Sequence, residues 1–346
     1  MKCGLIAGYS PAKVSIPIDF IKKAESLGFS SVWTAEAYGS DAVSPAAWIL
    51  AQTEKINVGT AIMQMPARTP AATAMTAMTL YALSGGRFIL GLGPSGPQVV
   101  EGWHGVAYGR PLTRTREYVS IIRKILERKE GVVHDGFHYQ MPFQGEGATG
   151  LGKPLKSILH GDPALKIYTA SISPAGMKCA GEVSDGVFPV WMNPERYDLF
   201  EGSLNEGFAK AGGGKGLDQF AICPFVTTIL GDDLEQCRMP VKQNMALYIG
   251  GMGARDKNFY NDYAKRLGYE EAAVEIQDLF LAGKKSEAAA AVPDALVDDV
   301  ALVGPEDRIR DRLQAWKEAG AKRQVDTLLM GGGQPRALEI IAEELL

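Results

Sequence analysis

The sequence predicts an α/β fold in which eight parallel strands alternate with helices and close into a (β/α)8 TIM barrel. Short apolar runs alternate with segments of helical periodicity along most of the chain. Strict alternation of this kind requires parallel strands joined by right-handed crossovers. Eight such units in 346 residues favour a closed barrel over an open sheet. The chain shows no internal repeat of solenoid length.

The expected strands are short apolar runs, many of them rich in β-branched residues. They span residues 3–7, 30–34, 55–62, 87–92, 165–170, 186–190, 220–230 and 325–330. The expected helices carry apolar residues three and four positions apart. They span residues 17–27, 46–52, 70–83, 113–129, 173–183, 194–211, 304–319 and 335–346. Glycines end several of these helices, as at Gly28 and Gly85, and Pro174 occupies a first turn, where proline is tolerated.

Two insertions interrupt the alternation. Residues 130–163 are rich in glycine and proline, with a small hairpin expected at 132–140. Residues 232–300 contain several helical segments and no strand. They are expected at 234–248, 257–267, 270–282 and 284–291. We therefore expect a single domain, residues 1–346, with these two insertions.

Composition narrows the class of partner. The chain has 40 acidic and 36 basic residues, a net charge of −4 and no run of like charge. This balance argues against a nucleic-acid or anionic-membrane partner. No apolar stretch is long enough to span a membrane, and the N-terminal run suits a first strand better than a signal peptide. The four scattered cysteines are typical of reduced, buried thiols, so we expect a cytoplasmic protein.

A glycine-rich loop follows the fourth expected strand, in Gly91-Leu92-Gly93-Pro94-Ser95-Gly96. A dinucleotide fold would open a helix at the third glycine and place an acidic residue about 20 positions further on. Here Pro97 and more glycines follow, which disfavours that fold. Two interpretations stay open. The loop closes a barrel strand, or its backbone N–H groups and the Ser95 hydroxyl meet a ribityl or phosphate group.

Two other strand ends carry candidate residues. Small residues in Gly59-Thr60-Ala61-Ile62 would let a flat ring approach the backbone, although an ordinary packed strand end is equally compatible. Glu36 follows the second expected strand, where a carboxylate suits binding or acid–base work. Its alternative role is to cap a helix or to pair with Arg68.

Apolar side chains at strand ends could form a substrate pocket, or could simply fill the core. They are Met63, Met65, Trp103, Trp191 and Met192. None of the four histidines falls on an expected strand end, and no HxH or HExxH motif occurs, so no metal site is predicted. Ser95 does not lie in a G-x-S-x-G context, which disfavours a serine nucleophile.

Three motifs together resemble the bacterial-luciferase-like superfamily. The most specific runs from Gly59-Thr60-Ala61-Ile62 through Arg68-x-Pro70 to Leu83-Ser84-x-Gly86-Arg87-Phe88-x-Leu90-Gly91-Leu92-Gly93. The others are Ala180-Gly181-x-x-Ser184-Asp185-Gly186 and Gly304-Pro305-Glu306-Asp307-Arg308-Ile309. Within that superfamily the chain resembles the coenzyme F420-dependent oxidoreductases, a branch that includes methylenetetrahydromethanopterin reductase and the deazaflavin-dependent glucose-6-phosphate dehydrogenase.

The resemblance implies a TIM barrel that holds a deazaflavin, coenzyme F420, at its C-terminal face. It implies a cis peptide bond at Ala61–Ile62 behind the ring, and contacts to the ring system from Gln64 and Glu36. The residues implied to bind the ribityl chain are Gly93, Pro94, Ser95, Gly96 and Val99. Those implied to bind the phosphate are Thr169, Ala170, Ser171, Ile172, Ser173 and Ala175. Family members are commonly homodimers.

The chain departs from the sugar-phosphate enzymes of this branch. Ala37 stands where they have a histidine, Pro97 where they have an acid, and Met192-Asn193 where they have a lysine. A proton donor would have to be Glu36, Tyr38, Asp41, His104, water or the substrate. We therefore expect hydride transfer between F420 and a small apolar molecule. The alternatives are an FMN-dependent monooxygenase of the same fold and a non-catalytic flavin- or deazaflavin-binding protein.

Overall fold

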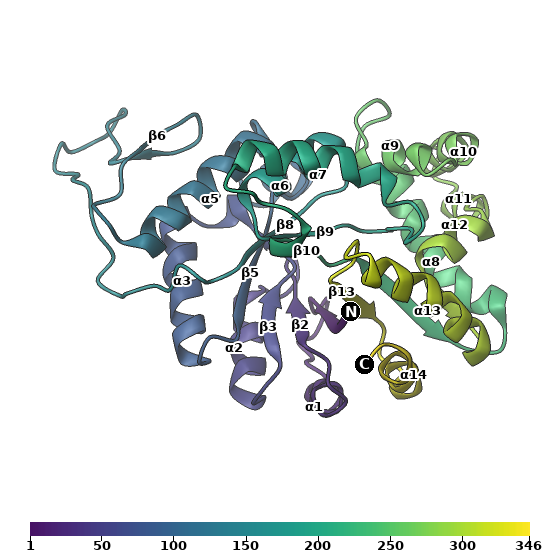
Figure 1. The fold of residues 1–346 in the computed structure, drawn as a ribbon. Coiled ribbons are helices and arrows are strands. Elements are labelled where there is room, and N and C mark those ends of the chain that lie inside the picture. The colour runs from purple at the N-terminus through teal and green to yellow at the C-terminus, as the bar shows by residue number, and fades with distance from the viewer.

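A computed structural model describes all residues from 1 to 346 and contains a curled parallel sheet surrounded by helices (Figure 1). All neighbouring strands of the main sheet run parallel. Its strands are β1 Lys2–Gly8, β2 Ser31–Thr34, β3 Asn57–Thr60, β4 Met63–Gln64, β5 Phe88–Gly93, β8 Ile167–Ala170, β9 Gly186–Phe188, β10 Ala221–Ile222, β11 Phe225–Leu230, β12 Leu302–Gly304 and β13 Thr327–Gly331. This confirms an α/β fold with the expected order of elements.

The sheet curls until its two sides meet at residues 221–230. Its order is β10-β9-β8-β5-β3-β2-β1-β13-β11-β12. β10 pairs with β9, while β11, two residues further along the chain, pairs with β13. The Phe225 amide also donates to the Pro189 carbonyl at 3.1 Å. The expected strand 220–230 is therefore two strands, because Pro224 has no N–H to donate at the break.

Helices follow the strands and cover the outside of the sheet (Figure 1). They are α1 Ile18–Ser26, α2 Val43–Gln52, α3 Pro70–Leu83, α4 Pro97–Gly102, α5 Pro111–Glu127, α6 Pro174–Val183, α7 Asp198–Ala211, α8 Leu234–Gly251, α9 Phe259–Arg266, α10 Glu270–Leu281, α11 Lys285–Ala290, α12 Asp294–Val300, α13 Glu306–Ala321 and α14 Pro335–Leu345. Short 3-10 turns cover Met65–Ala67 and Leu217–Gln219. No helix combines the length and the hydropathy that a membrane span needs.

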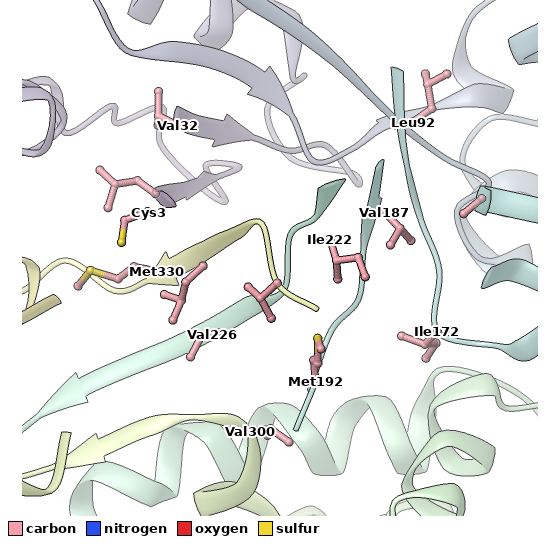
Figure 2. Close-up of a cluster of buried hydrophobic side chains, with 14 of the residues drawn as sticks. Cys3, Val32, Leu92, Ile172, Val187, Met192, Ile222, Val226, Val300 and Met330 are labelled. Carbon is pink, nitrogen blue, oxygen red and sulfur yellow. The ribbon is translucent and has the colours of Figure 1, made fainter. Parts of the chain in front are cut away.

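Two layers of buried side chains hold the fold together. Between sheet and helices lies a large apolar cluster, part of which is shown in Figure 2 with Val32, Leu92, Val187 and Met330 labelled. Inside the curl, Trp33 packs edge-on against Phe188 with ring centroids 4.9 Å apart. Alternation along each strand sends one residue to each layer, which is why Val32 and Trp33 face opposite sides.

The structure differs from the expected elements in other places too. The glycine-rich stretch after β5 contains α4, and residues 294–300 and 302–304 form α12 and β12. β12 has only three residues, too few to show a period. In the first insertion, β6 His134–Asp135 pairs antiparallel with β7 Gln140–Met141, near the expected hairpin. The second insertion contributes α8 to α12, which lie together on one side of the sheet (Figure 1).

Candidate functional site

The C-terminal ends of β3, β4, β5 and β8 lie next to one another and form the candidate site. β3 and β4 both pair with β5, which pairs with β8 on its other side. In this register Gln64 stands opposite Gly93, at the start of the glycine loop. The parallel sheet thus brings together three segments that are expected to contact one cofactor.

Close packing at β3 and β5 depends on glycine. The peptide bond between Ala61 and Ile62 is cis, as the resemblance implies. A Cβ atom at Gly91 would lie 1.7 Å from the Thr60 carbonyl oxygen, and one at Gly93 would lie 2.7 Å from the Ile62 side chain. The buried Thr60 hydroxyl donates to the Gly91 carbonyl at 2.7 Å. The same hydroxyl accepts from the Gly91 amide at 3.0 Å, so it is engaged in the contact between β3 and β5.

Glu36 forms a buried ion pair with Arg68. Its Oε1 accepts from Arg68 Nη1 at 2.5 Å and from the Gln64 amide at 2.8 Å. Its Oε2 accepts from Arg68 Nη2 at 3.1 Å and from the Ala42 amide at 3.0 Å. The Glu36 side chain is only 8% exposed. Four donors therefore occupy this carboxylate, and it ties the loop after β2 to β4 and to α2. This is the pairing with Arg68 that the sequence left open, and a role in acid–base chemistry stays an untested prediction.

Gln64 is held by a further set of hydrogen bonds. Its Nε2 donates to the carbonyl oxygens of Glu36 and Ala37, both at 3.0 Å. Its Oε1 lies 2.6 Å from Nε2 of His104, a residue just after α4. Gln64 is buried, whereas His104 is partly exposed. Gln64, which is expected to contact a cofactor ring, therefore also holds His104, one of the proton donors that the sequence left open.

The glycine loop keeps backbone groups available at its tip. Ser95 has φ of 60°, a left-handed conformation that is uncommon outside glycine. Pro94 has no N–H, while the N–H groups of Ser95 and Gly96, which precede α4, donate to no backbone carbonyl. Pro94 lies beside the start of α6, in the hollow described below. Val99 sits in α4 and its carbonyl accepts from the amides of Trp103 and His104.

Serines surround the start of α6, beyond the end of β8. Ser173 caps the helix by accepting from the Gly176 amide at 3.1 Å. A Cβ atom at Gly176 would lie 1.9 Å from the Ser171 hydroxyl, so only glycine leaves room for that side chain. A small hollow opens there, lined by Met65, Pro94, Leu112, Thr115, Thr169, Ala170, Ser171, Gly176, Cys179 and Ala180. Hydroxyls and a helix N-terminus suit a phosphate.

The other residues of the expected phosphate segment have further contacts within the fold. Thr169 is buried, and its hydroxyl lies 3.1 Å from that of Ser184, in the barrel wall. Ile172 belongs to the apolar core, and its carbonyl accepts from Arg266 Nη2 at 2.8 Å. Ala175 lies in the first turn of α6. Ser171, Ser173 and the helix start therefore have the side chains best placed for a phosphate, while Thr169 borders the hollow and also bonds within the sheet.

The residues of the expected substrate pocket lie at different depths. Met63 and Met192 are fully buried in the apolar core, which is the core-filling role that the sequence left open. Met65 is also buried but borders the hollow at α6. Trp103 is 67% exposed at the end of α4. Methionine fills irregular core space well, so these burials agree with core packing, and a role in substrate binding stays a prediction.

Trp191 has aromatic partners that the sequence did not reveal. Its ring centroid lies 5.5 Å from that of Tyr260 in α9 and 6.0 Å from that of Tyr248 in α8. The two tyrosines pack edge-on at 4.7 Å. Burial raises the pKa of both tyrosines, so their hydroxyls stay neutral. Only folding of the second insertion over β9 brings these three rings together, and the sequence holds no short-range signal for it.

The comparisons with known proteins agree with this architecture. The family described as "Luciferase-like monooxygenase" matches residues 8–323. The protein Rv3520c of Mycobacterium tuberculosis, whose name assigns it provisionally to the coenzyme F420-dependent oxidoreductases, is 43% identical over 94% of this chain and 95% of its own. A 5,10-methylenetetrahydromethanopterin reductase of Archaeoglobus fulgidus is 27% identical over 94% of this chain and 93% of its own.

A solved structure supports the fold independently. The coenzyme F420-dependent tetrahydromethanopterin reductase of Methanopyrus kandleri superposes with a TM-score of 0.79. The alignment covers 99% of this chain and 98% of that one at 22% identity, so it speaks for the fold alone. Because the family model matches most of this chain, the chain belongs to the bacterial-luciferase-like family and is related to the coenzyme F420-dependent oxidoreductases.

Proposed function

We propose that this protein is a coenzyme F420-dependent oxidoreductase that transfers a hydride to or from a small, apolar organic molecule. The observation that carries the proposal is the relative of 43% identity, which is named for this cofactor and aligns over 94% of the chain. When bound, F420 supplies a hydride donor or acceptor at its ring. The protein binds the cofactor, orients the substrate and keeps water away from the reacting atoms.

The residues around the site fit such a cofactor. Ser171, Ser173 and the first turn of α6 would hold the phosphate. The backbone of Gly93–Gly96 would follow the ribityl chain, with Ala61–Ile62 behind the ring. The space left at Gly176 supports this assignment, because any larger residue there would displace the Ser171 hydroxyl.

The substrate side of the proposal depends on the aromatic group Trp191, Tyr248 and Tyr260. These rings come from the end of β9 and from the second insertion, and no charged side chain pairs with them. Such a surface favours a flat or apolar molecule over a charged sugar phosphate. Replacing Trp191 by Ala should therefore raise KM more than it lowers kcat.

A cofactor titration tests the proposal. Purified protein is titrated separately with F420 and with FMN, and binding is followed by fluorescence. We expect F420 to bind more tightly, and Ser171→Ala to weaken that binding about tenfold, because one hydrogen bond to a charged phosphate is worth about 1.5 kcal/mol. Ser26→Ala, an exposed serine at the end of α1, is the matched control. Tight FMN binding without a response to F420 would favour an FMN-dependent monooxygenase, and binding without turnover would favour a carrier.

The proposal extends to the assembly and the compartment. The first insertion projects away from the barrel near β6 (Figure 1) and exposes Phe143, Leu151, Leu155 and Ile158. Large exposed apolar patches often mark protein interfaces. We therefore propose a cytoplasmic homodimer in which this arm contacts the second copy. Light scattering should give twice the chain mass, and Ile158→Glu should shift the protein toward the monomer. A monomeric wild type would refute the dimer.

A further inference from the structure

We propose that His104 is the proton donor and acceptor of this oxidoreductase, and that Gln64 fixes the imidazole for the task. This inference rests on the proposed function, because it assigns the proton that accompanies the hydride. Its starting observation is the 2.6 Å contact between His104 Nε2 and Gln64 Oε1, at the point where β4 meets the glycine loop.

The hydrogen bonds of Gln64 determine which ring nitrogen carries a proton. Gln64 Nε2 donates to two carbonyl oxygens, those of Glu36 and Ala37, which can only accept. If the side-chain amide of Gln64 were rotated by 180°, its oxygen would face these two carbonyl oxygens, and no hydrogen bond could form. Gln64 Oε1 must then face His104, and an oxygen acceptor requires a proton on His104 Nε2. Neutral His104 is thus held with Nε2 protonated and Nδ1 free.

Nδ1 of His104 is the nitrogen that can exchange a proton. It forms no hydrogen bond with the protein, and it is not among the buried polar atoms that lack a partner. The His104 side chain is partly exposed, so Nδ1 is open to solvent or to a bound molecule. The Gln64 residue that orients the ring is itself buried beside Gly93, the first residue of the loop expected to follow the cofactor.

The other possible proton donors near this strand end either already accept several hydrogen bonds or are not held in place by any. Glu36 already accepts four hydrogen bonds, two of them from Arg68. Asp41 Oδ2 caps α2 by accepting from the amides of Val43 and Ser44. Tyr38 is 61% exposed and no hydrogen bond orients it.

The remaining histidines lie elsewhere. His134 and His138 belong to the first insertion, where His134 approaches Glu117 and His138 Nε2 lies 3.0 Å from the Arg110 carbonyl. His160 is exposed in the same insertion. His104 is therefore the one imidazole that both borders the expected cofactor loop and is held by a strand residue.

The proton balance is simple. A carbonyl substrate that receives a hydride at carbon gains two electrons, its C=O π bond breaks, and its oxygen needs one proton. Protonated His104 gives that proton from Nδ1 and becomes neutral, with its other proton still on Nε2 against Gln64. Solvent then restores the proton on Nδ1. In the oxidising direction neutral Nδ1 takes the hydroxyl proton as hydride leaves carbon.

The first experiment reads the tautomer without any turnover. Two-bond proton–nitrogen spectra of 15N-histidine-labelled protein contain only four imidazoles, and His104→Gln assigns one of them. We expect neutral His104 to be protonated on Nε2 in the wild type, and to become a mixture of tautomers in Gln64→Leu. A proton on Nδ1, or a tautomer unchanged in Gln64→Leu, would overturn the orienting role.

The second experiment measures the chemical step. A substrate that the wild-type enzyme reduces is used to oxidise reduced F420 in a single turnover. The rate of this step is compared between the wild type, His104→Gln and the control His160→Gln. We expect His104→Gln to slow the step about 100-fold or more, the usual contribution of a general acid, with KM changed less than threefold and Tm unchanged. His160→Gln should behave as the wild type.

The outcomes separate the two proposals. Rapid turnover by His104→Gln, within threefold of an active wild type, would overturn the role of His104 alone. A wild type that oxidises no reduced F420 with any acceptor would overturn the proposed function, and the role of His104 with it. A loss that appears only as a lower Tm would reduce His104 to a structural residue.

Discussion

Replacing Glu36 by Gln tests whether this residue positions the site or transfers protons. Each carboxylate oxygen accepts one backbone amide and one Arg68 nitrogen. A glutamine places an NH2 group where one of these oxygens was. In either orientation of the side chain, this NH2 donor then faces a backbone N–H and an Arg68 N–H, which are also donors. Arg68, whose side chain is 24% exposed, also loses its counter-charge.

The magnitude follows from those contacts. Two hydrogen bonds to a charged acceptor are lost, at about 1.5–3 kcal/mol each. Breaking one side of a largely buried ion pair typically costs about 3–5 kcal/mol, a similar value. At about 2.1 cal/mol/K of unfolding entropy per residue, a chain of 346 residues loses roughly 1.4 °C in Tm per kcal/mol. We therefore expect Glu36→Gln to lower Tm by about 4–7 °C.

Differential scanning fluorimetry and F420 titration of the same variant provide the assay. The control is Asp198→Asn, which breaks an exposed pair with Arg196, with side chains 61% and 40% exposed. Exposed pairs contribute about 0–1 kcal/mol, so the control should keep its Tm within about 1.5 °C. An unchanged Tm in Glu36→Gln, together with a large loss of turnover, would refute the positioning role. It would indicate instead that Glu36 acts as an acid or base in the reaction.

Three other predictions concern particular contacts. Glu117 accepts from the amides of Phe137, His138 and Tyr139, and those bonds hold its pKa below the usual range despite burial. Its stabilisation is complete above the unfolded-state pKa and is lost as pH falls through the lower folded pKa. Proteolysis within residues 130–163 should thus increase in acid, and Glu117→Gln should show the same susceptibility at neutral pH. Gly91→Ala should destabilise by about 1–3 kcal/mol or more, since its Cβ would meet the Thr60 carbonyl at 1.7 Å, whereas Gly102→Ala, with nothing within 4 Å, should be neutral in urea unfolding. Burial raises the pKa of Cys179 to about 11 and that of Cys3 to about 12, so no thiol should react quickly with DTNB at pH 8 until the protein unfolds; a fast thiol would contradict this.

The sequence alone determined the order of strands and helices and the family. Periodicity is a local property, so α3 was expected at 70–83 and has those bounds. The family resemblance carried by the Gly59 to Gly93 motif implied the cis bond at Ala61–Ile62, which the structure confirms. Two short elements were not predicted from the sequence. α4 has a glycine at each end, and β12 is too short to show an alternating pattern.

Tertiary structure decided which groups at the strand ends remain available for chemistry. Glu36 and Arg68 are 32 positions apart, and Gln64 and His104 are 40 apart, so no local pattern could show that the first pair closes on itself while the second leaves Nδ1 open. The same holds for Trp191 and Tyr260, which meet only because α9 folds over β9. Hydrogen bonds and ring contacts reach only a few ångströms, and it is the curled sheet that brings such distant residues within that range.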